Sequence, residues 1–225
     1  LDVAADGRRV AFTVMQAEMM AGKSEFRSRV YLSNGPGSQA VPLTGGEASS
    51  FAPQWSPGGD AIAYLSQRNI WLYLPETGKV QQVTAVPTSV SSFKWSADGS
   101  MIAFTAADEA TAGESEAEKN GIRIRGEGMM KQRLRLVSLA ETANGPVSGR
   151  VLTGAEIHTG SPEVPEAYNW SPDGRMIVFS HSPSPQPNDW PGTRLALLQV
   201  ADGSIRALGR EDAVCFDAHF SPDGK

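Results

Sequence analysis

The chain has 225 residues, of which 40% are hydrophobic and 20% are charged, with a formal net charge of −5. This composition allows one large domain or two small ones, and the mild acidity argues against a general nucleic-acid binder, whose surface would be basic. The single cysteine excludes an internal disulfide and a cysteine zinc cluster.

No apolar run approaches the ~20 residues that a membrane span needs. No signal peptide is visible, but the chain starts at Leu1 and not at a methionine, so we expect a trimmed N-terminus. The compartment therefore stays open, cytoplasmic or periplasmic.

A turn motif recurs along the chain and predicts a series of hairpins. Its copies are Ala5–Gly7, Trp55–Gly59, Trp95–Gly99, Trp170–Gly174 and Phe220–Gly224. Proline presets the backbone for a type I turn, and aspartate bonds the local backbone. Glycine takes the left-handed position that a three-residue hairpin needs. Alternating apolar residues flank the turns, so each copy predicts a strand, a tight turn and a second strand.

A second pair of strands is predicted after each hairpin. Residues 70–73 and 80–84 read as strands on either side of a turn at Glu76–Gly78, and the pattern recurs at 30–44, 134–153 and 195–209. Four antiparallel strands repeated every ~40–50 residues are typical of propeller blades, which bury both faces against their neighbours. A β-sandwich is the alternative, but it would not need the same motif in every fourth strand.

The predicted fold is therefore an all-β propeller of four-stranded antiparallel blades. The chain holds about four blades and the start of a fifth, an incomplete ring. We expect the blades at roughly 1–47, 48–88, 89–160, 161–212 and, truncated, 213–225.

The connections between blade strands differ in length, and the long ones are predicted to lie on one face. They are residues 17–26, 108–128, 154–167 and 181–192. Loops on a rigid scaffold are where function usually lies, although loops also tolerate sequence drift cheaply. The last of these loops is proline-rich, so we expect it to be stiff and extended, not helical.

These loops supply the candidate residues for contact with a substrate or partner. They are charged or aromatic side chains: Glu109, Arg123, Arg125, His158, Glu163, Glu166, Asp189 and Trp190. By contrast, the tryptophans Trp55, Trp95 and Trp170 recur at one repeat position and are expected to pack between blades.

A search for catalytic motifs predicts no catalytic residue, metal site or cofactor. Residues 17–24 resemble a phosphate-binding loop with Ala17 in place of the first glycine, but residues 26–32 read as a strand where that motif needs a helix. The chain contains neither a G-x-S-x-G nucleophile elbow nor an H-E-x-x-H zinc motif.

Three features of the sequence support a family resemblance. They are the W-S-x-D-G-x-x-I-A-F copies, the G-x-V-x-x-L-T endings, and the segment Pro183–Trp190 followed by Arg194–Leu197. They resemble the N-terminal propeller of prolyl oligopeptidase-family serine peptidases, nearest the acylaminoacyl-peptidase and dipeptidyl-peptidase-like branches. The likeness covers essentially the whole chain.

That resemblance implies that catalysis and substrate selection belong to two different domains. In the family a C-terminal α/β-hydrolase domain carries the catalytic Ser, Asp and His, while the propeller caps it and filters peptide substrates by size. Since the chain stops at Lys225 inside a blade motif, we expect the hydrolase domain to lie outside it and the chain alone not to be catalytic. In dipeptidyl peptidases a glutamate pair from the propeller binds the substrate amine, and no glutamate here is assigned to that pair.

The expected partners are thus a peptide substrate and a hydrolase domain of the parent protein, with no nucleic acid. One alternative is a stand-alone periplasmic or cytoplasmic propeller for protein–protein interaction, because the chain holds no catalytic motif. A weaker one is a sugar- or metabolite-binding propeller enzyme, which would need a carboxylate or metal cluster around its channel.

Overall fold

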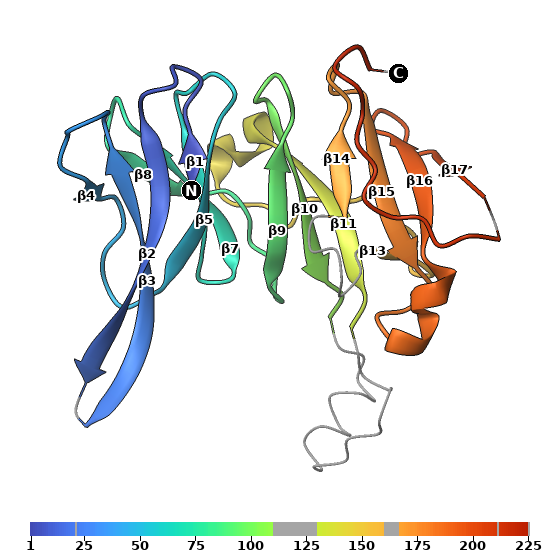
Figure 1. The fold of residues 1–225 in the computed structure, drawn as a ribbon, viewed down its shortest axis with the longest axis horizontal. Helices are drawn as coiled ribbons and strands as arrows, with labels where there is room; N and C mark the ends of the chain where they lie inside the picture. The colour runs from blue at the N-terminus through green and yellow to red at the C-terminus, as the bar shows by residue number, and fades with distance from the viewer. Residues whose placement is uncertain (21, 110–129, 160–166, 211, 225) are drawn as a thin grey trace. The chain divides into compact units, whose positions relative to one another are not determined.

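The computed structural model describes residues 1–20, 22–109, 130–159, 167–210 and 212–224. Four antiparallel sheets and two short 3-10 helices make up these residues (Figure 1). The all-β fold of four-stranded, propeller-type sheets is confirmed. None of the helices in the described part of the chain is long and apolar enough to span a bilayer.

The chain divides into two compact units. The first contains Leu1–Val86 together with Asp98–Met101 and Val137–Ser148, and the second contains Pro87–Ala97, Ile102–Leu136 and Gly149–Lys225.

The first unit holds two complete sheets, each with its strands in sequence order. The strands are β1 (Asp2–Val3), β2 (Val10–Met20), β3 (Lys23–Ser33) and β4 (Val41–Pro42), then β5 (Ser50–Trp55), β6 (Ile62–Ser66), β7 (Asn69–Leu74) and β8 (Lys79–Gln82).

Two further sheets belong mainly to the second unit, although the 3-10 helix η1 (Leu139–Asn144) groups with the first. One sheet contains β9 (Val90–Trp95), β10 (Met101–Ala107), β11 (Gln132–Ser138) and β12 (Arg150–Val151). The other contains β13 (His158–Thr159), β14 (Tyr168–Trp170), β15 (Met176–Ser182), β16 (Arg194–Gln199) and β17 (Ile205–Leu208).

The repeated turns form as the motif predicts, and local hydrogen bonds explain its serine and glycine. Gly59 has a φ of 69° and donates its N–H to the Ser56 carbonyl at 2.9 Å. The Ser56 hydroxyl accepts the N–H of Ala61 at 3.0 Å. Ser171 repeats this role, because its hydroxyl accepts the Met176 N–H at 2.9 Å. Each of these two turns therefore satisfies its backbone groups by local hydrogen bonds.

Trp55 lies in the core between the two sheets of the first unit. It is 5% exposed and packs with Ala11, Leu32 and Ile62. The Arg9 guanidinium lies 4.5 Å from the centre of its ring, a cation–π contact. For this copy of the motif, packing between blades is confirmed.

Tyr168 joins the two sheets of the second unit. It is 1% exposed, and its hydroxyl donates to the Ala103 carbonyl at 3.3 Å. Trp170 adds an indole hydrogen bond to the Lys94 carbonyl at 3.2 Å. Unlike Trp55, however, Trp95 and Trp170 are only half-buried, so smaller aromatic rings fill most of the core here.

The connection expected at residues 17–26 is not a loop, because β2 and β3 continue as a two-stranded ribbon (Figure 1). Their pairing reaches Met20 with Lys23. Met15, Met19 and Phe26 share one face of the ribbon and are 66%, 79% and 70% exposed. The expectation of a strand instead of a phosphate-binding helix at residues 26–32 is confirmed.

Two further connections differ from their expected form. The strand β13 lies inside the connection expected at residues 154–167. It pairs with β15 of the fourth sheet, whereas the expected blade boundaries place residues up to 160 in the third blade. The proline-rich loop contains a 3-10 helix, η2 (Pro187–Gly192), so the expectation of a non-helical loop was wrong. The reason is that proline's fixed φ suits the first turn of a helix, where its missing N–H is not needed.

Candidate functional site

Several described strand ends of the second unit lie together at one end of its two sheets. We call this region the loop end. It consists of the end of β10, the start of β11, strand β13, the end of β15 and helix η2. The register supports this grouping, because His158 pairs with Ser182 and Thr159 with His181.

An ion pair between a buried arginine and a half-exposed aspartate joins β10 and β11 at the loop end. Arg133 is 7% exposed, and its guanidinium lies 3.0 Å from the Asp108 carboxylate and also donates to the Thr153 carbonyl. The Asp108 N–H donates to the Lys131 carbonyl at 2.9 Å. Because a buried arginine needs such partners, this pair fixes the backbone from which the exposed Glu109 projects.

His158 is a positioning residue at the loop end and not an exposed one. It is 6% exposed, and its Nδ1 accepts the backbone N–H of Gln132 at 3.0 Å. Burial, followed by the nearby positive charge of Lys131, lowers the pKa of His158 to about 4. The ring is therefore neutral at neutral pH, with its proton on Nε2, and it holds β13 against β11.

His181 lies beside it on β15. Its ring centre is 5.6 Å from that of Phe179, and its strand partners are Thr159 and Arg194. Burial, and then the charge of Arg194, lower the pKa of His181. Arg194 itself donates to the Pro191 carbonyl at 3.0 Å, so it links β16 to η2.

Helix η2 presents the aromatic group of the loop end. The Asp189 carboxylate accepts a hydrogen bond from the Ser184 hydroxyl, which ties the helix to the loop before it. The Trp190 carbonyl accepts the N–H of Thr193 at 2.9 Å and its hydroxyl at 2.7 Å. With its backbone held in this way, Trp190 leaves its side chain 40% exposed.

The described side chains of this arrangement offer contacts for binding. The part of the chain that the structure describes holds no cluster of three or more His, Cys, Asp or Glu side chains that could ligate a metal. His158 uses one ring nitrogen on a backbone amide. Glu109 and Trp190 remain as an exposed carboxylate and an exposed indole, groups that recognise a cation and an apolar side chain.

The structure describes four of the eight predicted contact residues. Asp189 and Trp190 are neighbours on η2, Glu109 follows the ion pair at the end of β10, and His158 is buried in β13. The other four lie outside the described residues: Arg123, Arg125, Glu163 and Glu166.

Sequence reasoning missed Arg133 and His181. The run Arg133-Leu134-Arg135-Leu136 alternates polar and apolar residues, which normally places the arginines in solvent. Only the tertiary pairing with Asp108 reveals a buried guanidinium. For His181, the one signal in the sequence was the strongly apolar run at residues 176–179 shortly before it.

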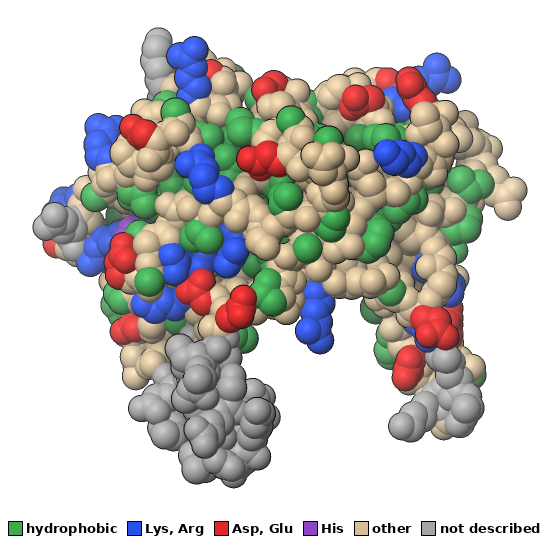
Figure 2. All heavy atoms as spheres, turned by 180° about the vertical axis from the view of Figure 1, so that it is seen from behind, with side chains coloured by type: hydrophobic (Ala, Val, Ile, Leu, Met, Phe, Trp, Pro, Cys, Tyr) green, Lys and Arg blue, Asp and Glu red, His purple; other side chains and the backbone are tan. Residues whose placement is uncertain are grey.

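The surface charge agrees with the composition. Figure 2 shows basic and acidic side chains interspersed over the visible face, without a continuous basic stripe among the residues described there.

Known proteins resemble the chain in both sequence and fold. Residues 5–121 match the family model for the dipeptidyl peptidase IV (DPP IV) N-terminal region. The uncharacterized peptidase YuxL of Bacillus subtilis (strain 168) is 27% identical over 195 residues, which cover 79% of this chain and 28% of YuxL. Dipeptidyl-peptidase 5 of Porphyromonas endodontalis is 24% identical over 243 residues, which cover 98% of this chain and 35% of that protein.

A solved structure supports the same fold. Porphyromonas gingivalis dipeptidyl peptidase 4 matches 91% of this chain and 31% of its own with a TM-score of 0.61, at 13% sequence identity. At that identity the likeness shows the fold alone. The chain spans 28% and 35% of the length of the two curated relatives.

Proposed function

The chain belongs to the family of the dipeptidyl peptidase IV N-terminal region, as an N-terminal propeller of the prolyl oligopeptidase type, and we propose that it gates and filters peptides for an α/β-hydrolase domain. The curated relatives are named as peptidases, and this chain matches about a third of each. The catalytic serine, aspartate and histidine would then lie in another part of the parent protein.

One observation carries the proposal: the described part of the loop end presents exposed binding groups on a base of hydrogen-bonded strand ends. The Asp108–Arg133 ion pair and the buried His158 fix the strand ends. Trp190 and Glu109 are left exposed on that base. A filter needs such positioned contacts more than it needs reactive groups.

Within this proposal the contact residues have distinct roles. Glu109 attracts the positively charged amino end of a peptide, and Trp190 packs on an apolar side chain. Asp189 holds the helix that carries Trp190. The charged residues outside the described part complete the filter: Arg123, Arg125, Glu163 and Glu166.

The test uses the full-length parent protein. Its gene should encode a nucleophile-elbow serine, followed by an aspartate and a histidine, downstream of Lys225. Rates on dipeptidyl and aminoacyl chromogenic substrates would be compared with rates on peptides of increasing length. Trp190→Ala and Glu109→Gln should change the ratio of kcat/KM between long and short substrates, whereas Glu47→Gln, an exposed residue of the first unit, should not.

The proposal fails if the gene lacks the serine, aspartate and histidine pattern. It also fails if both loop-end variants leave the length dependence of kcat/KM unchanged.

A stand-alone interaction propeller is the second candidate. The observation that favours it is the exposed apolar face of the β2–β3 ribbon, at Met15, Met19 and Phe26. Further blades and no hydrolase pattern in the parent gene would establish this candidate instead.

A further inference from the structure

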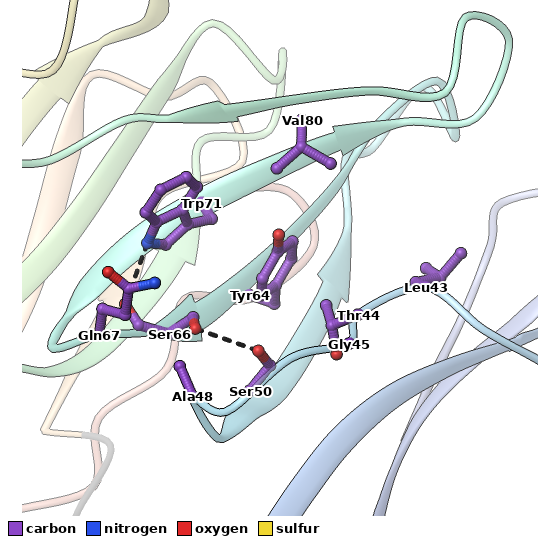
Figure 3. A pocket seen from close by; sticks show the side chains of 10 residues that line it. All are labelled: Leu43, Thr44, Gly45, Ala48, Ser50, Tyr64, Ser66, Gln67, Trp71 and Val80. Atoms are coloured by element: carbon purple, nitrogen blue, oxygen red, sulfur yellow. Dashed lines mark hydrogen bonds between the residues drawn. The ribbon is translucent and has the colours of Figure 1, made fainter.

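A cavity of about 220 Å³ opens in the first unit (Figure 3). Tyr64 and Ser66 line it from β6, Trp71 from β7 and Ser50 from β5. Because side chains alternate along a strand, Tyr64 lies on the same face of β6 as the core residue Ile62. The space between the sheets is therefore packed around Trp55 and Ile62 and hollow around Tyr64.

Tyr64 is the unusual residue of this cavity. It is 4% exposed, yet its hydroxyl has no hydrogen-bond partner among the described residues. In Figure 3 the ring stands in the cavity with its hydroxyl directed toward Val80. Burial raises the pKa of Tyr64, so the hydroxyl remains a donor at neutral pH. The hydroxyl oxygen itself is not fully buried, so it faces the open cavity and is available to donate to a ligand.

In the other copies of the internal repeat a phenylalanine occupies this position. Counted from the turn glycine, the position of Tyr64 is occupied by Phe12, Phe104 and Phe179 in the other copies. Phe104 and Phe179 are 0% and 1% exposed in their own sheets. A phenylalanine thus serves the packing role, and the second blade alone among the four carries a hydroxyl there.

The other polar groups around the cavity are mostly satisfied by one another. The Trp71 indole N–H donates to the Ser66 carbonyl at 3.0 Å, and the Ser50 hydroxyl donates to that of Ser66 at 3.1 Å. Gln67 also lines the cavity, but it is exposed, so its side-chain amide is open to solvent. The lining contains no charged side chain, which favours an uncharged ligand.

The turn that carries Gln67 adds backbone strain at the cavity. Gln67 and Arg68 have φ angles of 49° and 67° in the two-residue connection between Ser66 and Asn69. Glycine or asparagine would adopt these angles at lower cost. The chain keeps a long amide side chain against the cavity in spite of that cost.

We propose that this cavity binds one uncharged aromatic side chain of a peptide. The ring packs on Trp71, and a peptide carbonyl accepts the hydrogen bond of the Tyr64 hydroxyl. The volume lies below the about 300–1,000 Å³ typical of sites for drug-sized ligands, so it suits a single ring-sized group. The inference rests on the proposed function only for its choice of a peptide as the ligand.

Calorimetric titration of the chain with small amides tests the proposal. The probes are the N-acetyl amides of phenylalanine, leucine, lysine and glutamate. We expect saturable binding of the phenylalanine amide, weaker binding of the leucine amide and none of the two charged ones. Absence of saturable binding of the phenylalanine amide, or equal binding of all four, overturns the proposal.

The Tyr64→Phe variant tests the role of the hydroxyl. Loss of one hydrogen bond should weaken binding of the phenylalanine amide about threefold to tenfold. Because the variant restores the residue of the other repeats, its urea midpoint should stay the same or rise. Tyr31→Phe is the matched control, since Tyr31 packs on Phe12 outside the cavity. Equal affinities of the two variants would overturn the assignment.

These measurements separate this inference from the proposed function. If the parent protein filters peptides but the chain binds no amide, only the cavity assignment fails. If the amide binds but the parent gene encodes no hydrolase, only the proposed function fails.

Discussion

His158 should make the stability of the chain depend on pH below neutrality. Its pKa is lowered from the ordinary 6.5 to about 4 in the folded state. Between these values the unfolded chain binds a proton at this ring and the folded chain does not, so acid favours unfolding. The stabilisation from the neutral ring is complete above pH 6.5 and is lost as the pH falls toward 4.

The structure gives the size and the cause of this effect. Protonation of Nδ1 would remove the acceptor of the Gln132 N–H and add a charge near Lys131. At about 1.4 kcal/mol per pKa unit, the loss reaches roughly 3 kcal/mol at pH 4 and about 2 kcal/mol at pH 5.

Urea unfolding at pH 7, 6 and 5 measures the effect. His158→Gln should flatten the fall in the free energy of unfolding between pH 7 and pH 5 by about 2 kcal/mol. His219→Gln is the control, because the side chain of His219 is 65% exposed and lies 3.2 Å from Asp217. His181, whose pKa is also lowered, contributes equally in all three proteins. The same pH dependence in His158→Gln and the unmodified chain would refute the reasoning.

Two further pairs of variants test the packing and the turns. Phe104→Ala should cost about 3–5 kcal/mol because Phe104 is 0% exposed, whereas Phe26→Ala, at 70% exposed, should stay within about 0.5 kcal/mol in urea unfolding. Gly59→Ala should cost about 1–2 kcal/mol through its φ of 69° and its crowding of Arg9, and Gly58→Ala much less. Similar losses within either pair would contradict the assigned positions.

The turns could be predicted from sequence because their determinants are local. Ser56 and Gly59 bond to backbone groups within five residues, so the motif carries its own geometry. The strands follow from the apolar alternation on either side. The ribbon beyond Met15 could not be predicted in the same way, because its apolar residues face solvent and its length depends on cross-strand pairing.

The site was less predictable than the fold. Alternation places Arg133 on a polar face, and only the structure shows its buried guanidinium paired with the half-exposed Asp108 carboxylate. His158 was expected as a contact residue because it lies in a long connection, but pairing of β13 with β15 draws it into the interior. Both side chains depend on partners more than 20 residues away, which a local pattern does not contain.

Comparison of the four repeats shows positions at which one blade carries a different residue from the others. Neither a motif search nor burial alone reveals such a position. At the position of Tyr64, burial would be read as core packing, as it is for Phe104 and Phe179. The added hydroxyl without a partner is what distinguishes the second blade. If it were only tolerated, Tyr64→Phe would change stability and nothing else. If it holds a ligand, the same variant keeps or gains stability and loses affinity, because the hydroxyl then donates to the ligand and not to the protein.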